Sequence, residues 1–452
     1  MKSLNKLACV VFIVLAGAIS ARAGEFLIHN GDRVVFLGDS ITEQRLYTTY
    51  VEAYALTRHP EWSLTFRNAG WGGDTSWLRQ RSHPDENKLF SADDATQQKM
   101  VEEAVSSGLE RDVLPLKPTF VTVKFGMNDH AYQAFREDIF HAYVRSQTEI
   151  AKELEAHGAR VAFLTPQPIE DSKRKDPDQD VRNQSLRKFA DGLKELAEKN
   201  NATFVDQFDP YMAMLLRERP SHPGQFIGAG DAVHPGPTGH TVMAWAILKG
   251  LGATAEVSQA EIDATGRKVV AADNCKVSDV KFDNGTLTFD RLDDALPMPI
   301  DDRAEAALKL APILEDLDKL ELKVTGLQAG TYEVKIDGVS AGKVSTEELG
   351  RGWNFANAPG PISEQAGRVL KGVFEKNNVY YKRWRAVQLF EFPKWARVSG
   401  TEEARATELA RLDKEIEKME AEINEDRKPK THHFELTVVA RKPPVECKVK
   451  VR

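Results

Sequence analysis

The first half of the chain alternates short apolar runs with longer amphipathic runs, and this alternation restricts the possible folds more than any other feature. The short runs are rich in β-branched and aromatic residues, which favour strands. They occupy residues 33–37, 64–67, 120–124, 160–164 and 203–205. The amphipathic runs, which are typical of helices, occupy residues 41–57, 92–107, 135–156, 181–199 and 237–250. Strands separated by helices predict βαβ crossovers, and therefore a three-layer α/β/α fold around a parallel sheet.

Composition excludes several other classes of protein. At 452 residues the chain is long enough for two or three domains, and its 41% apolar and 29% charged residues are ordinary for a soluble globular protein. A net charge of −7 offers no basic surface to a nucleic acid. Three cysteines are too few for a disulfide scaffold or a cysteine-rich zinc module, and the sequence shows no cluster of metal ligands. We therefore expect no metal, no cofactor and no nucleic-acid partner.

The N-terminus has the pattern of a secretory signal peptide. Lys2 and Lys6 precede an apolar run at residues 7–19, and the small-x-small sequence at residues 21–23 is typical of a cleavage site. The alternative, a membrane anchor, is disfavoured because a spanning helix needs about 20 apolar residues. We therefore predict a signal peptide over residues 1–23 and an exported protein, periplasmic or extracellular, with no integral membrane segment after cleavage.

Export would allow a disulfide bond between the two cysteines that remain after cleavage. Cys275 and Cys447 both lie in the C-terminal part of the chain, and an oxidising compartment permits a bridge. Two buried free thiols are equally compatible with the sequence.

The loop after the first predicted strand carries a serine. In parallel sheets, ligands bind beyond the carboxyl ends of the strands, so the residues there are candidates for function. Gly38, Asp39 and Ser40 follow the first strand and start the next helix. A helix N-terminus favours negative charge nearby, which suits a reacting serine. Ser40 is also a good N-cap, and this motif by itself does not decide between the two interpretations.

The loops after the second and third strands carry glycines and an asparagine. The second loop, NAGWGGDT at residues 68–75, has glycines that let the backbone approach a ligand and point N–H groups at it, although a plain tight turn is the alternative. The third loop, residues 125–129, places Asn128 as a neutral N–H donor beside the strand end. An Asx-turn is the alternative role for Asn128.

The loop before the last helix of this half carries an aspartate three residues before a histidine. Asp231 and His234 lie on a loop that Pro235 ends. This spacing allows the carboxylate to contact the imidazole Nδ1–H, which fixes the tautomer and supports an imidazolium. His240 falls inside the predicted helix and is expected to be a packing or surface residue.

Taken in order, the four loops resemble the signature blocks of the SGNH/GDSL hydrolase family, the GDSL-like lipases and acylhydrolases. The blocks read GDS, a glycine in NAGWGGDT, GMND and DAVHP, and the resemblance covers about residues 30–250. The first block continues as GDSI rather than GDSL, and the third reads GMND rather than the commoner GTND or GGND. The resemblance implies a flavodoxin-like, three-layer hydrolase domain that needs no metal.

The resemblance also implies a role for each loop. Ser40 matches the nucleophile, His234 the general base and Asp231 the group that orients the base. The backbone N–H of Ser40 matches the first donor of the oxyanion hole, and the Asn128 side-chain amide matches the third. The second donor is the backbone N–H of Gly73.

The assignment of the second donor and of the substrate pocket is less direct. Gly70 is the alternative to Gly73 as an oxyanion donor. Gln44, Trp71 and Arg79 follow the first two blocks and are candidates for substrate binding, as are segments 166–168 and 170–180 after the fourth strand. Arg79 would suit an anionic sugar or a phosphate, but a structural ion pair is the favoured role for such an arginine.

Beyond about residue 253 the pattern changes. Two alternating runs at residues 277–289 flank Asn284 and Gly285, a strong hairpin signal, and further strands are expected at 322–325, 331–336 and 433–439. They predict a small antiparallel β-sheet or sandwich interrupted by a helical insertion. The predicted units are the signal peptide, a hydrolase domain over residues 24–252, and a β-rich domain over residues 253–452 with the insertion at about 361–426.

The helical insertion has two distinctive patterns. Apolar residues at 409, 412, 416, 419 and 423 form a short a/d seam, which favours a hairpin packed within the chain over a dimer interface. The aromatic and basic run at residues 380–385 suggests carbohydrate or nucleic-acid binding, but aromatic packing with basic tips at the surface is favoured. The oligomeric state is not predicted.

These observations predict an exported serine esterase that acts on short acyl groups, acetate above all, carried by carbohydrates. Its partner would be an ester substrate, for example an acylated glycan. A lysophospholipase or thioesterase of the same family is the alternative. A non-catalytic surface-binding protein would lack one of the implied catalytic residues, and all of them are present.

Overall fold

The computed structural model describes residues 25–200 and 202–441. The predicted signal peptide and Cys447 lie outside these residues, so the two alternatives for the cysteines, a bridge or two free thiols, are not tested; the Cys275 side chain is buried. No helix in the described ranges combines the length and the apolar character that a membrane crossing requires.

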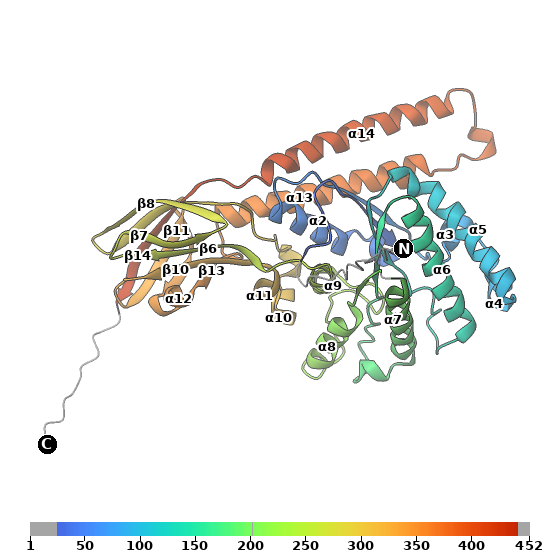
Figure 1. The fold of residues 1–452 in the computed structure, drawn as a ribbon, viewed down its shortest axis with the longest axis horizontal. Coiled ribbons are helices and arrows are strands. Elements are labelled where there is room, and N and C mark those ends of the chain that lie inside the picture. Colours follow the sequence, from blue (N-terminus) through green and yellow to red (C-terminus); the bar gives the residue numbers. More distant parts are fainter. Residues whose placement is uncertain (1–24, 201, 442–452) are drawn as a thin grey trace, which may run out of the picture.

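The first half of the chain folds around a five-stranded parallel sheet, as predicted (Figure 1). The strand order is β2-β1-β3-β4-β5, which is the flavodoxin-like order. The strands are β1 (Arg33–Gly38), β2 (Thr65–Gly70), β3 (Phe120–Lys124), β4 (Arg160–Leu164) and β5 (Thr203–Val205). The order reverses direction at β1 and β3, and ligands bind at such a switch point.

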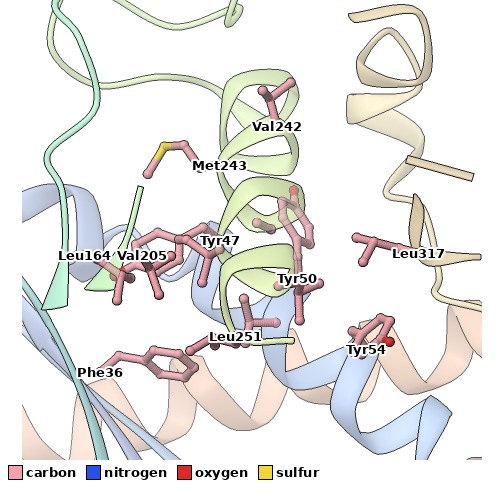
Figure 2. Packing of buried hydrophobic residues seen from close by; sticks show 14 of the residues in the cluster. Phe36, Tyr47, Tyr50, Tyr54, Leu164, Val205, Val242, Met243, Leu251 and Leu317 are labelled. Carbon is pink, nitrogen blue, oxygen red and sulfur yellow. The ribbon is translucent and has the colours of Figure 1, made fainter. Parts of the chain in front are cut away.

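Helices cover both faces of this sheet because its strands are apolar on both sides. Val34 and Phe36 of β1 face one core, and Val35 and Leu37 face the other. Over the first core lie α2 (Leu46–Arg58), α8 (Phe208–Glu218) and α9 (Pro237–Gly250). Over the second lie α5 (Asp94–Asp112), α6 (Glu137–Ala156) and α7 (Val181–Asn200). Figure 2 shows the first core, with Phe36 of the sheet near Tyr47 of α2.

The helix predicted at residues 41–57 is two helices. A short α1 (Ser40–Glu43) is followed by α2, and the break is at Arg45, whose φ of 60° is left-handed. The Arg45 guanidinium donates to the carbonyl of Glu43 at 2.6 Å, which stabilises the break. Hydrophobic periodicity does not reveal it, because α2 is buried on all sides from Tyr47 to Arg58 and so offers no single buried face whose phase could change at the break.

The second half contains a β-sandwich. One sheet has the order β13-β10-β6-β7 and the other β12-β11-β14-β9-β8. The first sheet is made of β6 (Glu256–Asp263), β7 (Lys268–Asp273), β10 (Lys319–Thr325) and β13 (Trp353–Asn354). The second is made of β8 (Cys275–Asp283), β9 (Thr286–Asp293), β11 (Gly330–Ile336), β12 (Val339–Ser345) and β14 (His432–Arg441). Apolar residues of both sheets share one core, among them Ile262, Leu322, Phe289 and Leu436.

Some strands of the sandwich were predicted and others were not. The predicted hairpin is β8 and β9, with Asn284 and Gly285 at positive φ in the turn. The sequence pattern did not predict β6, β7, β12 and β13. All six residues of β7 are exposed, so the strand has no buried face to leave a pattern. The pairing of β6 with β10 is parallel, whereas the other pairs of the sandwich are antiparallel.

Short helices connect these elements. They are α3 (Arg79–Ser82), α4 (Glu86–Ser91), α10 (Ala307–Leu310), α11 (Ile313–Leu317) and α12 (Thr346–Arg351). Helices α10 and α11 contribute Ala307, Ile313 and Leu317 to the same core as α2 and α9. Figure 2 shows Leu317 beside Tyr54 of α2. The two halves of the chain therefore share apolar packing.

A long helical hairpin is inserted between β13 and β14. It consists of α13 (Pro361–Tyr381), a π-helical continuation (Lys382–Gln388) and α14 (Thr401–Asp426). In Figure 1 the hairpin extends from the sandwich along the α/β layers, with α13 beside α2. It packs within the chain as predicted, and Leu412, Ile416 and Ile423 of the seam are buried.

A buried ion pair joins the hairpin to the α/β layers. Lys376 of α13 donates to a carboxylate oxygen of Glu52 in α2 at 2.5 Å, and both side chains are buried, with exposed fractions of 1% and 4%. Asn377 donates to the other Glu52 oxygen at 3.0 Å. A buried charge that loses its partner is strongly unfavourable, so this pair holds the two helices in one register.

We expect Lys376→Met to lower the free energy of unfolding by about 3–5 kcal/mol, because Glu52 would stay buried without its partner. Urea denaturation of the purified protein measures the change. Lys371→Met is the matched control, because its partner Glu375 lies on the same helix and the Lys371 side chain is 76% exposed; a change below about 1 kcal/mol is expected there. Equal losses in the two variants would contradict the importance of the buried pair.

Candidate active site

The loops after β1, β2 and β3 meet at the switch point of the sheet. Gly38, the last residue of β1, lies so close to β3 that a Cβ atom there would be 2.6 Å from the carbonyl oxygen of Lys124. Such a contact is well inside van der Waals distance, so no larger residue fits without moving a strand. The glycine of the GDS sequence is therefore needed for the serine turn to pack against the neighbouring strand end.

Ser40 is the first residue of α1, and its hydroxyl is not the helix cap. Asp39 occupies the N-cap position, and its carboxylate accepts the N–H of Ile41 at 2.9 Å. This leaves the Ser40 Oγ free, and it lies 2.9 Å from Nε2 of His234. The Ser40 backbone N–H, at the first position of the helix, is not used by a helical hydrogen bond. The N-cap alternative for Ser40 is therefore not the one that the structure adopts.

Asp231 is close to the other side of the His234 ring. One carboxylate oxygen accepts the backbone N–H groups of Val233 (2.7 Å) and His234 (2.8 Å), and the second lies 3.4 Å from Nδ1 of His234. Partial burial opposes ionisation of Asp231, but these hydrogen bonds and the nearby imidazole outweigh it and hold the pKa of Asp231 below its ordinary value. Asp231 is therefore ionised where it faces the ring.

The glycine loop after β2 presents a backbone N–H of Gly73. The N–H of Asp74 donates to the carbonyl of Trp71 at 3.0 Å, which closes a turn with Gly73 at its third position, where φ is +76°. The peptide between Gly72 and Gly73 takes no part in that hydrogen bond, so its N–H is available.

Gly70, the alternative donor, is used differently. Its N–H donates to Oδ1 of Asn68 at 2.9 Å, and a Cβ at this position would overlap the backbone of Thr42 and Glu43 in α1. Gly70 is a close-contact residue whose N–H already has an acceptor, which favours Gly73.

The third loop places Asn128 beside this turn. Its Nδ2 donates to the carbonyl of Asp74 at 2.8 Å. The carboxylate of Asp129 ties the two loops together, since it accepts the N–H groups of Ser76 (2.8 Å) and Gly126 (2.9 Å). Burial raises the pKa of Asp129 to about 6. The loops that converge at this edge of the sheet thus carry all five of the predicted residues, namely Ser40, Gly73, Asn128, Asp231 and His234.

The predicted substrate-binding residues make contacts within the protein. Arg79 donates to the carbonyl of Gly73 at 2.6 Å and pairs with Glu86 at 3.4 Å, which is the structural role that the sequence favoured. Gln44 Oε1 lies 2.9 Å from Nε2 of His240, which is fully buried. Burial lowers the pKa of His240 to about 3 and keeps it neutral. His240 is a packing residue, as expected.

Trp71 contacts the helical hairpin. The Arg385 guanidinium lies 3.9 Å from the centre of the Trp71 ring, and the Trp384 ring meets it edge-on at 5.8 Å. Arg385 also donates to Glu43 of α1 at 2.7 Å, and Tyr381 donates to the same oxygen at 3.0 Å. The hairpin thus reaches the helix that begins with Ser40, a contact that the sequence did not predict.

A buried lysine lies below the serine turn and was also missed. Lys124, the last residue of β3, donates to Gln167 Oε1 at 2.9 Å, and Gln167 donates to the carbonyl of Val233, next to His234, at 3.0 Å. Burial lowers the pKa of Lys124, and the nearby Asp39 opposes this shift. The signal available in the sequence was a lysine at the end of an otherwise apolar strand.

Glu170 holds the loop that carries Asp231 and His234. Its carboxylate accepts the N–H groups of Ile227 and Gly228, and its own N–H donates to the carbonyl of Ala232 at 2.8 Å. Glu170 is 2% exposed, and burial raises its pKa from 4.5 to about 7.

Among the described residues, no group of three or more His, Cys, Asp or Glu side chains is arranged to hold a metal ion.

We expect the pH dependence of stability to reveal Glu170. Because its folded pKa is above its unfolded value, the folded state binds the proton more tightly, so this contribution is complete below about pH 4.5 and is lost as the pH rises through about 7. Glu170→Gln has no carboxyl group to ionise at this position, so its free energy of unfolding does not fall in this pH range. The fall expected in the wild type is about 3 kcal/mol at most. The stability difference between variant and wild type should therefore shift in favour of the variant from pH 5 to pH 8.

Urea denaturation at several pH values measures this shift. Glu155→Gln, at an exposed position of α6, is the matched control and should leave the pH dependence unchanged. If the free energy of unfolding changed with pH in the same way in wild type and in Glu170→Gln, the raised pKa of Glu170 would be ruled out.

Known proteins resemble the chain in sequence and in fold. Residues 36–242 match the model of the GDSL-like lipase/acylhydrolase family. An acetylxylan esterase of Geobacillus stearothermophilus is 24% identical over 253 residues, 50% of this chain and 96% of that enzyme. Its crystal structure, at 23% identity, has a TM-score of 0.38 over the same shares of the two chains.

The similarity to another solved structure extends over both halves. A gut microbial diltiazem-metabolizing enzyme, 24% identical, has a TM-score of 0.74 and matches 91% of this chain and 98% of its own. At that identity the likeness shows the shared fold, including the region beyond the parallel sheet. The family match, with the α/β architecture, identifies residues 36–242 as a GDSL-like lipase/acylhydrolase (SGNH/GDSL) domain, and this family hydrolyses esters.

Proposed function

We propose that the chain is a serine esterase in which Ser40 is the nucleophile, His234 the general base and Asp231 the residue that orients the base. The observation that carries the proposal is the contact of 2.9 Å between Ser40 Oγ and His234 Nε2, with an Asp231 oxygen 3.4 Å from the opposite ring nitrogen. An imidazole between a hydroxyl and a carboxylate can remove the hydroxyl proton and is stabilised once it is charged.

The proposed reaction proceeds through an acyl-enzyme. His234 Nε2 takes the Ser40 proton while Oγ forms a bond to the ester carbonyl carbon, which gives a tetrahedral oxyanion. His234 then returns the proton to the alcohol oxygen as the bond from that oxygen to the acyl carbon breaks. Water adds to the acyl-enzyme by the same route, releasing the acid and restoring Ser40.

Three N–H donors would stabilise the oxyanion in this scheme. They are the backbone N–H groups of Ser40 and Gly73 and the Asn128 side-chain amide. The dipole of α1 adds to the effect of the Ser40 N–H, although a four-residue helix contributes little by itself. Loss of one such donor typically lowers kcat by about 10²–10³-fold.

We further propose that the substrate is a short acyl ester, acetate above all, on a carbohydrate, and that the protein is exported. The support is the sequence similarity to an acetylxylan esterase and the signal-peptide pattern of residues 1–23. The division into a catalytic unit over residues 24–252 and a second unit over residues 253–452, with its hairpin at about 361–426, also stays a prediction. No observation of the structure favours a lysophospholipase or thioesterase.

Ser40→Ala should lower the hydrolysis of p-nitrophenyl acetate by about 10⁴-fold or more, since the nucleophile would be missing. Release of p-nitrophenol measures the rate, and circular dichroism checks that the fold is intact. Ser91→Ala, at an exposed position in α4, is the matched control and should retain full activity. Equal rates for wild type and Ser40→Ala would refute the mechanism.

A comparison of substrates tests the carbohydrate assignment. We expect acetate release from acetylated xylan, pectin or a sialoglycan to exceed fatty-acid release from lysophospholipid, with Ser40→Ala as the blank in each assay. Titration of the released acid makes the substrates comparable. Activity on the lipid and none on the glycans would overturn the assignment and favour the lysophospholipase alternative.

A further inference from the structure

Tyr132 lies outside the four sequence motifs, yet it contacts one of the proposed oxyanion donors. Its hydroxyl donates to Oδ1 of Asn128 at 3.0 Å. The side chain is 41% exposed, so burial of the ring alone does not explain its position. This contact with Asn128 places the phenol at the edge of the proposed active site.

The two partners of Asn128 determine which way its amide points. Nδ2 faces the carbonyl of Asp74, which can only accept, so a flipped amide would put two oxygens in contact. The other end of the amide, Oδ1, accepts from Tyr132. Nδ2 has two hydrogens and uses one on Asp74, so the other remains for an oxyanion.

The backbone around Tyr132 is held in a conformation that only strong local contacts sustain. Ala131 and Tyr132 have φ values of 52° and 55°, two successive non-glycine residues in the left-handed region. This region is unfavourable for residues that carry a Cβ atom. Hydrogen bonds from the Ala131 N–H to the Asn128 carbonyl (3.1 Å) and from the His130 N–H to the Gly126 carbonyl (3.2 Å) maintain the turn. A strained backbone of this kind persists only where the surrounding contacts maintain it. Here the strained turn places the Tyr132 hydroxyl beside Asn128.

The protonation state of the phenol suits donation. Partial burial and the neighbouring carboxylates, Asp39 first among them, raise the pKa of Tyr132 to about 12. The hydroxyl therefore keeps its proton at any pH at which an esterase would be assayed. A hydrogen bond received by an amide oxygen also polarises the amide and strengthens its N–H groups as donors.

We propose that Tyr132 is a positioning residue of the oxyanion hole, holding the Asn128 amide so that its free N–H faces the oxyanion. The inference rests on the proposed function, in which Asn128 is an oxyanion donor. Because the oxyanion forms only after attack, the contribution appears in kcat rather than in KM. Loss of one hydrogen bond between neutral groups is expected to lower kcat by about 3- to 10-fold.

The test is a double-mutant cycle with Tyr132→Phe and Asn128→Ala, assayed on p-nitrophenyl acetate. The Phe variant keeps the ring and loses only the hydroxyl. We expect kcat to fall by about 3- to 10-fold with KM and melting temperature unchanged. In the Asn128→Ala background, which should retain about 10⁻²–10⁻³ of kcat, Tyr132→Phe should cause no further loss.

A matched control is Tyr54→Phe, whose hydroxyl donates to the carbonyl of Thr254 away from the site and whose kcat should equal that of wild type. Tyr132→Phe with wild-type kcat, or an equal loss in both backgrounds, would overturn the inference. So would wild-type kcat in Asn128→Ala, since Tyr132 would then have no donor to position. Ser40→Ala tests the proposed mechanism separately. A failure of the Tyr132 inference can therefore be distinguished from a failure of the proposed serine esterase mechanism.

Discussion

The proposed active site depends on the close backbone contact between the ends of β1 and β3. Gly38 lies against the carbonyl of Lys124, and only a residue without a side chain permits that distance. The serine turn begins directly after Gly38, and the loop that carries Asn128 begins directly after Lys124. The separation of Ser40 from Asn128 is therefore set by backbone packing in the sheet, which is rigid compared with loops that depend only on their own contacts.

Buried polar groups also connect the sheet to the loop that carries His234. Lys124 connects through Gln167 to the carbonyl that precedes His234, and Glu170 holds the other parts of the same loop. Asp231 is 63% exposed in its side chain and cannot anchor the loop by burial. The buried groups behind the loop therefore anchor its backbone, while Asp231 holds the end of the loop and the His234 ring from the exposed side.

The sequence predicted the parallel sheet and the four loops, because both leave local signals. Apolar runs alternate with amphipathic ones, and the glycines, Ser40 and His234 occupy strand ends. It did not predict the parallel pairing of β6 with β10 or the contact of Arg385 with Trp71, because pairing between distant segments has no local signature. Likewise Lys124 and Glu170 have hydrogen-bond partners more than 40 residues away, which no local motif can show. Tyr132 contacts a nearby residue, Asn128, but through a left-handed backbone at residues 131 and 132 that residue type does not disclose.

The hairpin changes how the second half of the chain is interpreted. A module that only binds a polymer would have no reason to contact α1, the helix that begins with Ser40. Here Tyr381 and Arg385 both donate to Glu43, three residues after Ser40, while Lys376 is fixed to α2 by a buried pair. The guanidinium groups of Arg385, Arg81 and Arg111 all lie over the Trp71 ring, 3.9, 5.2 and 5.4 Å from its centre, so this ring packs against protein side chains. The hairpin thus contacts both α1, through Glu43, and the loop after β2, through Trp71, so the second half of the chain helps to hold two of the loops at the proposed active site.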